Sequence, residues 1–298
     1  MVKQKNILIT GGAGFIGSNL VKFILKKNLA RKIIILDNYS SGNKINHVTN
    51  NKVTYIRGDT KNILTNKKIV KNNIDLIFHL AEFSRIVQSF QYFEKCWDSN
   101  IIGTKKVIEL ALLKKAKLIY SASSSKFGPK TNEFLSPYAW TKAKNVELIK
   151  CYKEWYGLDY VIAYFYNVYG PNQIRKHHMS AVIGIFEEQF VSNQPLTVVS
   201  PGSQKRDFTH VYDIVEGFIK AGFYKKNQEY QLASGKLYTI MQVAKMFESK
   251  IKVIPQRPGE RFSSKRDNLS KSKKELNFKI KYNLKKYIQD FIKKHNNT

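Results

Sequence analysis

The segment TGGAGFIG, at residues 10–17, constrains the fold of this chain more than any other stretch. It follows a short apolar run at 6–10 and opens a stretch with apolar residues at helical spacing. Its glycines, Gly11, Gly14 and Gly17, permit a tight strand-to-helix turn and let a phosphate approach the backbone. Free amide groups at the start of the helix can then hold that phosphate. The segment therefore predicts a strand–turn–helix unit that binds a dinucleotide.

Further apolar runs alternate with helical stretches after this segment. Strand-like runs stand at 32–36, near 53, 76 and 118, and at 160–166, and helical patterns at 15–27 and 100–116. This alternation predicts an α/β fold with a doubly wound parallel sheet, Rossmann-like, covered by helices on both faces. Shorter pieces follow Pro171: helical patterns at 182–192, 212–223, 239–249 and 284–295, and a strand-like run at 195–199.

We therefore expect two domains. A Rossmann domain at 1–171 would bind the dinucleotide, and a smaller C-terminal α/β domain at 172–298 would bind the substrate. Part of 203–225 is expected to pack back on the first domain. The acid at the end of the second predicted strand, Asp37, stands where it can bind a ribose diol and repel a 2′-phosphate. NAD is therefore favoured over NADP as the cofactor.

The net charge of +29 over 298 residues raises the alternative of a nucleic-acid binder. The lysines are mostly single or paired along the whole chain, without a zinc-finger or RNA-binding signature, which favours a general attraction for small anions. No apolar run approaches the roughly 20 residues that span a bilayer. Cys96 and Cys151 allow no disulfide framework and no metal-ligand spacing. With no signal-peptide pattern, we expect a cytoplasmic protein without a metal, a membrane or a specific nucleic-acid partner.

A second pattern, YAWTK, places Tyr138 and Lys142 on one helix face. A nearby ammonium favours the tyrosinate form, which makes a tyrosine usable as a general base or acid. The serine-rich segment SASSSKFG at 121–128 precedes it and offers a hydroxyl for the reacting oxygen. The same spacing recurs at Tyr282 and Lys286, but no serine-rich segment precedes it, and we interpret that pair as a solvated helix face.

Taken together, these segments resemble the extended short-chain dehydrogenase/reductase family, and within it the nucleotide-sugar 4-epimerases. The similarity runs nearly end to end through GGAGFIGSNL, LDNYSSG, HLAE, NIIGT, SPYAWTK, YFYNVYGP, GSQKRDFTHVYDIV and RPGE. It implies inversion of C4 in a UDP-hexose, UDP-glucose/UDP-galactose or the N-acetyl forms, through a transient 4-keto intermediate. Counting back from Gly128, it implies the catalytic set Ser123, Tyr138 and Lys142.

The resemblance also implies binding residues. Those for the cofactor are Gly11, Gly14, Phe15, Ile16, Gly17, Asp37, Asn38, Ser41, Gly42, Asp59, Thr60, Leu80, Ala81, Glu82, Asn100, Tyr138, Lys142 and Tyr166. Those for the nucleotide sugar are Ser123, Asn167, Ser180, Ala181, Thr197, Val199, Arg206, Arg257 and Glu260. Two arginines suit a diphosphate because the guanidinium fork matches its oxygens.

The resemblance further implies a homodimer through helices around 86–115 and 134–156. Apolar surface for it is expected from Leu110, Leu112, Leu113, Val146 and Ile149, some of which must face the sheet. His79 is interpreted as a structural histidine, and the tryptophans as packing residues: Trp97, Trp140 and Trp155.

Two departures from the family pattern concern the sugar pocket. The segment HLAA is HLAE here, which introduces Glu82, and Tyr164 replaces an arginine. The alternatives within the family are dehydratases, decarboxylases and reductases. Dehydratases and decarboxylases carry an acid one or two positions after the catalytic serine or threonine, where this chain has Ser124 and Ser125. A catalytically silent NAD-binding module is the alternative from another class.

Overall fold

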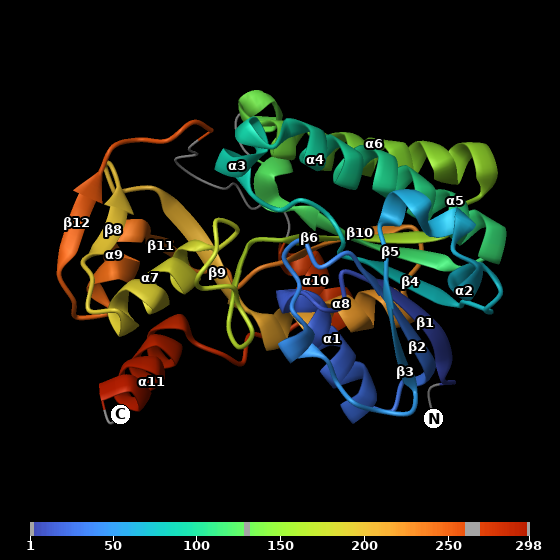
Figure 1. Cartoon of the computed structure of the whole chain (residues 1–298), viewed down its shortest axis with the longest axis horizontal. Helices are drawn as coiled ribbons and strands as arrows, with labels where there is room; N and C mark the ends of the chain where they lie inside the picture. Colours follow the sequence, from blue (N-terminus) through green and yellow to red (C-terminus); the bar gives the residue numbers. More distant parts are fainter. Residues whose placement is uncertain (1–2, 128–131, 260–268, 297–298) are drawn as a thin grey trace.

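The computed structural model describes residues 3–127, 132–259 and 269–296. Its main feature is a seven-stranded sheet in the order β10–β6–β5–β4–β1–β2–β3, in which all neighbouring strands are parallel (Figure 1). The strands are β1 Lys5–Thr10, β2 Ala30–Asp37, β3 Val53–Arg57, β4 Leu76–His79, β5 Lys117–Ser123, β6 Tyr160–Phe165 and β10 Gln228–Leu232. The predicted doubly wound sheet is confirmed. The seventh strand, β10, was not predicted.

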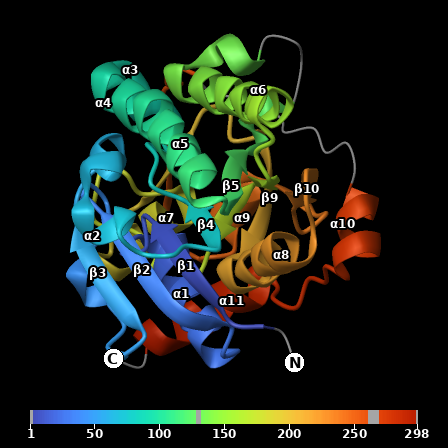
Figure 2. The same cartoon turned by 90° about the vertical axis from the view of Figure 1, so that its right-hand side faces the viewer.

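Helices cover both faces of this sheet, which explains why its strands are continuous apolar runs. Figure 2 shows α3 to α6 together on one side of the sheet, with α1 and α8 on the other. The helices of this part are α1 Phe15–Lys26, α2 Lys67–Val70, α3 Ile86–Gln91, α4 Phe93–Trp97, α5 Thr104–Lys114, α6 Pro137–Tyr156, α8 Val211–Tyr224 and α10 Leu269–Leu276. A π-helical segment, Asp98–Gly103, joins α4 to α5.

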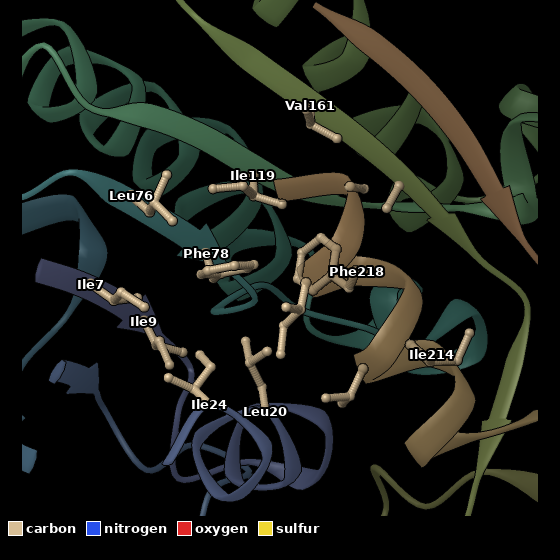
Figure 3. Close-up of a cluster of buried hydrophobic side chains, with 14 of the residues drawn as sticks. Ile7, Ile9, Leu20, Ile24, Leu76, Phe78, Ile119, Val161, Ile214 and Phe218 are labelled. Carbon is tan, nitrogen blue, oxygen red and sulfur yellow. The ribbon is translucent and has the colours of Figure 1, made fainter. Parts of the chain in front are cut away.

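The core on the α1 and α8 side holds residues that are far apart in the sequence (Figure 3). Phe78 of β4 meets Phe218 of α8 edge to face, with ring centroids 5.2 Å apart. A Cβ at Gly222 would lie 2.9 Å from the Ile119 side chain, so this glycine lets α8 lie close to the sheet. Burial of such side chains contributes about 1.5–3 kcal/mol each. This face of the sheet is therefore covered by α8 together with α1.

The core on the other face is built by α5 and α6. Leu110, Val146 and Ile149 lie in it with at most 1 % exposure, so these three of the five residues expected at a dimer surface face the core instead. Leu113 and Trp155 are about 60 % exposed, and Trp155, which was expected to be a packing residue, contacts the Tyr152 and Tyr156 rings of its own helix.

A smaller part stands beside the large sheet (Figure 1). It contains the three-stranded sheet β11–β9–β7 and the parallel pair β12–β8. Its elements are β7 Asn167–Tyr169, α7 Val182–Val191, β8 Leu196–Val199, β9 Lys205–His210, β11 Leu237–Thr239, α9 Ile240–Lys245, β12 Ile251–Ile254 and α11 Leu284–Asn296. Phe186, Phe247 and Phe291 are central to its own core.

The chain does not stay in the smaller part after residue 171. Helix α8 and strand β10 return to the large sheet, and Phe278, which follows α10, packs against α8 at Gly217. The domain boundary at residue 171 stays a prediction. No helix in the described ranges combines the length and apolar character needed to cross a membrane.

Candidate active site

A cavity of about 440 Å³ lies between the carboxyl ends of the large sheet's strands and the smaller part. Parallel α/β sheets bind their ligands at this edge. Most predicted binding residues line it: Gly11, Gly14, Phe15, Ile16, Gly17, Asp37, Asn38, Ser41, Thr60, Leu80, Ala81, Glu82, Ser123, Tyr138, Lys142, Tyr166, Asn167, Ser180, Ala181, Thr197, Val199, Arg206 and Arg257. Gly42, Asp59 and Asn100 stand outside this lining, and Glu260 lies outside the described residues.

The glycine turn closes one end of the cavity. Gly11 has a φ of +77°, a conformation that favours glycine, and a Cβ on Gly17 would lie 2.1 Å from the Gly11 carbonyl oxygen. The close packing of turn and helix therefore requires glycine at both positions. Gly14 caps α1 without a side-chain hydrogen bond, and the first turn of α1 contains no acid. The start of α1 thus has the character of an anion site.

Asp37 ends β2 at the same end of the cavity. Its carboxylate accepts hydrogen bonds from the backbone N–H of Ala13 (2.9 Å) and of Tyr39 (2.8 Å). Burial raises the pKa of Asp37, and these two hydrogen bonds oppose that rise. Gly42 lies directly beside the carboxylate, since a Cβ there would come within 2.9 Å of Oδ1. Gly42 therefore packs against Asp37, the residue predicted to bind the ribose, and does not line the cavity itself.

Two other residues that are predicted to bind the cofactor, Asn100 and Asp59, form side-chain hydrogen bonds within the protein. Asn100 is buried, accepts from the Phe83 N–H at 2.7 Å and donates to the Thr141 hydroxyl at 3.0 Å. It thereby fixes the loop after β4 to α6. Asp59 accepts from the Asn38 side-chain amide at 3.0 Å. Asp59 thus holds a cavity residue in place.

The predicted catalytic residues Ser123, Tyr138 and Lys142 all line the cavity. Ser123 is the last residue of β5, and its hydroxyl accepts from the Ser125 N–H at 3.1 Å. Helix α6 begins directly before Tyr138, where the Ser136 hydroxyl accepts from the Ala139 N–H at 3.1 Å. This cap fixes the start of the helix, so Tyr138 and Lys142 project from its first turns.

Lys142 is not a free cation, because it forms an ion pair with Glu82. The two side chains are 6 % and 2 % exposed. The other carboxylate oxygen of Glu82 accepts from the Tyr120 hydroxyl (2.9 Å), the Asn145 amide (2.9 Å) and the Thr104 hydroxyl (3.1 Å). Burial raises the pKa of Tyr120, and the Glu82 charge adds to that rise. Glu82 is therefore an acid of the cavity wall whose two carboxylate oxygens both have partners in the protein.

A buried histidine extends this network to the first strand. His79 has one ring nitrogen 2.7 Å from the Thr10 hydroxyl and the other 2.9 Å from the Thr104 hydroxyl. Burial lowers the pKa of His79 to about 4, so its ring is neutral at pH 7. Both ring nitrogens of His79 thus have hydrogen-bond partners inside the protein, which agrees with a structural role.

The far end of the cavity belongs to the smaller part. Asn167 of β7, Thr197 of β8 and Arg206 of β9 line it, and Arg257 follows β12. Tyr164, the second departure from the family pattern, is buried on β6 and donates its hydroxyl hydrogen to Glu229. Tyr164 stands outside the lining.

The sequence profile of the NAD-dependent epimerase/dehydratase family matches residues 7–233. The chain belongs to this family.

Three proteins illustrate the range of this family. A protein of Methanocaldococcus jannaschii, provisionally named a UDP-glucose 4-epimerase, is 30 % identical over 82 % of this chain and 82 % of its own length. UDP-glucuronic acid decarboxylase 6 of Arabidopsis thaliana is 28 % identical over 94 % of this chain and 85 % of its own. The structure of UDP-N-acetylglucosamine 4-epimerase from Methanobrevibacter ruminantium, with bound UDP-N-acetylmuramic acid, is 29 % identical, covers 98 % of each chain and has a TM-score of 0.86.

NAD is the cofactor of the epimerase/dehydratase family, and the residues of this chain fit it. The turn at Gly11 and Gly17 leaves no room for a Cβ, and the start of α1 is free of acids, which suits a pyrophosphate. Asp37 at the end of β2 suits a ribose diol. Among the described residues, no group of three or more His, Cys, Asp or Glu is placed to hold a metal ion.

Several cavity residues were missed by the sequence analysis. Five follow β4 in the segment after Glu82: Ser84, Arg85, Ile86, Val87 and Gln88. These residues could have been predicted from their position directly after a central strand, because open α/β sheets bind their ligands at the carboxyl ends of the strands. Others precede α7 or lie in its first half: Gln173, Ile174, Val182, Ile185 and Phe186. That segment carries no motif of its own.

Proposed function

We propose that this chain is an NAD-dependent nucleotide-sugar 4-epimerase, which inverts C4 of a UDP-hexose. The observation that supports the proposal is that Ser123 and Tyr138 line the same cavity as the glycine turn, Arg206 and Arg257. Bound NAD would supply the hydride acceptor and donor that inversion at C4 requires.

The chain's own residues would handle the proton. Tyr138 takes the proton of the 4-hydroxyl group and returns it after inversion, while the Ser123 hydroxyl holds the same oxygen by a hydrogen bond. Lys142 holds the wall behind them through its bond to the Ser121 carbonyl oxygen (2.6 Å) and its pair with Glu82. Arg206 and Arg257 would bind the diphosphate, away from the reacting carbon. The sugar can then turn over while the nucleotide stays bound.

The composition of the cavity wall supports epimerisation over dehydration or decarboxylation. Elimination needs a general acid beside the catalytic serine, but Ser124 lines the cavity there and Ser125 is buried. In the part of the lining that the structure describes, the acids are Asp37 and Glu82. The first is bonded at the ribose end and the second is engaged by Lys142.

The test is incubation of the purified protein and NAD with UDP-glucose, UDP-N-acetylglucosamine and UDP-glucuronic acid. NMR of the products should show inversion at C4 for at least one of them. Release of water or carbon dioxide would assign a different reaction of the same family. A melting shift with NAD but no turnover would instead support the silent NAD-binding module.

A further inference from the structure

Arg85, at the start of α3, presents a cation to the cavity and has no acidic partner among the described residues. Its Nε donates to the Met179 carbonyl oxygen at 2.6 Å, and Nη1 donates to the Ser84 carbonyl oxygen at 2.8 Å. Both acceptors are neutral. Within the described residues, no carboxylate lies within ion-pair distance of this guanidinium, and Nη2 makes no hydrogen bond. Burial lowers the pKa of Arg85, because removal from water disfavours the charged guanidinium. No acid among the described residues offsets this desolvation cost.

A charge count of the described lining shows why this cation matters. The cationic side chains are Arg85, Lys142, Arg206 and Arg257, and the acidic ones are Asp37 and Glu82. Glu82 neutralises Lys142. A diphosphate bound at the far end would use Arg206 and Arg257. Arg85 is then the cation that neither the wall nor the nucleotide compensates.

Arg85 stands at the sugar end of the cavity. The Ser89 hydroxyl of α3 accepts a hydrogen bond from the Tyr138 N–H at 3.2 Å, which ties the segment that contains Arg85 to the start of α6. Arg85 and the Tyr138 phenol are also close enough for their charges to interact. A nucleotide sugar that reaches from Arg206 to Tyr138 would therefore present its reacting ring to Arg85.

We propose that Arg85 selects a nucleotide sugar with a carboxylate on the sugar ring, such as a UDP-hexuronic acid. This inference rests on the proposed function and narrows its substrate class. Guanidinium and carboxylate match as a two-pronged, charge-assisted pair, and the ligand would supply the negative charge that the described part of the wall does not offer to Arg85. Neutral sugars would leave Arg85 uncompensated.

The experiment compares UDP-glucuronic acid with UDP-glucose, which differ in this carboxylate. Dissociation constants are measured by calorimetry on the NAD-saturated protein, for the wild type, Arg85→Gln, Arg85→Lys and Arg31→Gln. Arg31 is an exposed arginine near the opposite, amino end of β2 and is the control for loss of one positive charge. C4 inversion of both sugars is followed by NMR in parallel.

We expect the wild type and Arg31→Gln to bind UDP-glucuronic acid about tenfold to a hundredfold more tightly than UDP-glucose. Arg85→Gln should lose this preference but keep its affinity for UDP-glucose, and Arg85→Lys should retain part of it. Equal affinity of the wild type for both sugars, or an equal loss of both in Arg85→Gln, would overturn the inference. Preference without inversion of either sugar would reject the epimerase and leave the inference standing.

Discussion

The Lys142 ammonium and the Glu82 carboxylate, 60 positions apart in the chain, form a buried ion pair in the wall of the cavity. Removal of one partner leaves the other as an uncompensated buried charge, which costs about 3–5 kcal/mol. Glu82→Ala should therefore lower the free energy of unfolding by about that amount in urea titration. Glu109→Ala, which removes an acid from more exposed pairs with Lys105 and Lys106, should cost about 1 kcal/mol or less. Equal losses in both variants would contradict this account.

Tyr138→Phe removes the proposed acid and base but retains the ring. Turnover should fall by roughly 10²–10⁴-fold, whereas NAD binding and the melting temperature should be nearly unchanged. Tyr282→Phe, in the other tyrosine–lysine pattern, should stay active. The measurement is the initial rate of C4 inversion, with NAD occupancy checked by absorbance. Full activity of Tyr138→Phe would end the proposed mechanism.

The two serines should differ in their effects. Ser123→Ala should also be slow, though less so than Tyr138→Phe. Ser125→Ala should be nearly neutral, because the buried Ser125 hydroxyl has no hydrogen-bond partner among the described residues. The same rate assay checks this order. A Ser125 variant as slow as the Ser123 variant would mean that the catalytic serine is misassigned.

Asp37→Ala should weaken NAD binding, since the carboxylate is placed for the ribose diol. It should also narrow the difference between NAD and NADP, because the charge that repels a 2′-phosphate is gone. Fluorescence titration with both cofactors measures this. Asp159→Ala, which removes an exposed acid from its pair with Lys226, serves as the control. A wild type that binds NADP more tightly would show that Asp37 has another role.

His79 should make the protein less stable in mild acid. Its pKa is lowered from 6.5 to about 4, so the unfolded chain binds a proton below pH 6.5 that the folded chain rejects. Stability is therefore lost as the pH falls from 6.5 toward 4. Urea titrations at pH 7.5 and 5 should show a smaller difference for His79→Gln than for the wild type. An unchanged difference would mean that other groups dominate.

The chain should form a homodimer through the face of α3 to α6. Phe93, Leu113 and Trp155 are exposed on these helices, and such aromatic and aliphatic side chains are enriched at interfaces. Light scattering should give twice the chain mass at micromolar concentration, and Trp155→Glu should reduce it. Tyr224→Glu, at an equally exposed residue on the opposite side of the sheet, should not. A monomer throughout would exclude this assembly.

The sequence allowed the large sheet to be predicted because each of its first six strands is a local apolar run, and the glycine turn joins β1 to α1 by short-range rules. Strand β10 has mixed composition, QEYQL, and joins the sheet only through its pairing with β6. The positions of Arg85 and Glu82 depend on partners far along the chain, at Met179 and Lys142. Local patterns give no information on such pairs.

The return of α8 and β10 to the large sheet has a consequence for how the protein can be divided. A fragment that ends at residue 171 would lack the edge strand beside β6 and the helix over Phe78, and it would expose that apolar face to water. The first half is therefore not expected to fold alone. Because the chain crosses between the two parts repeatedly, the parts are linked by several connections in parallel, which favours small opening motions over a wide swing about one hinge.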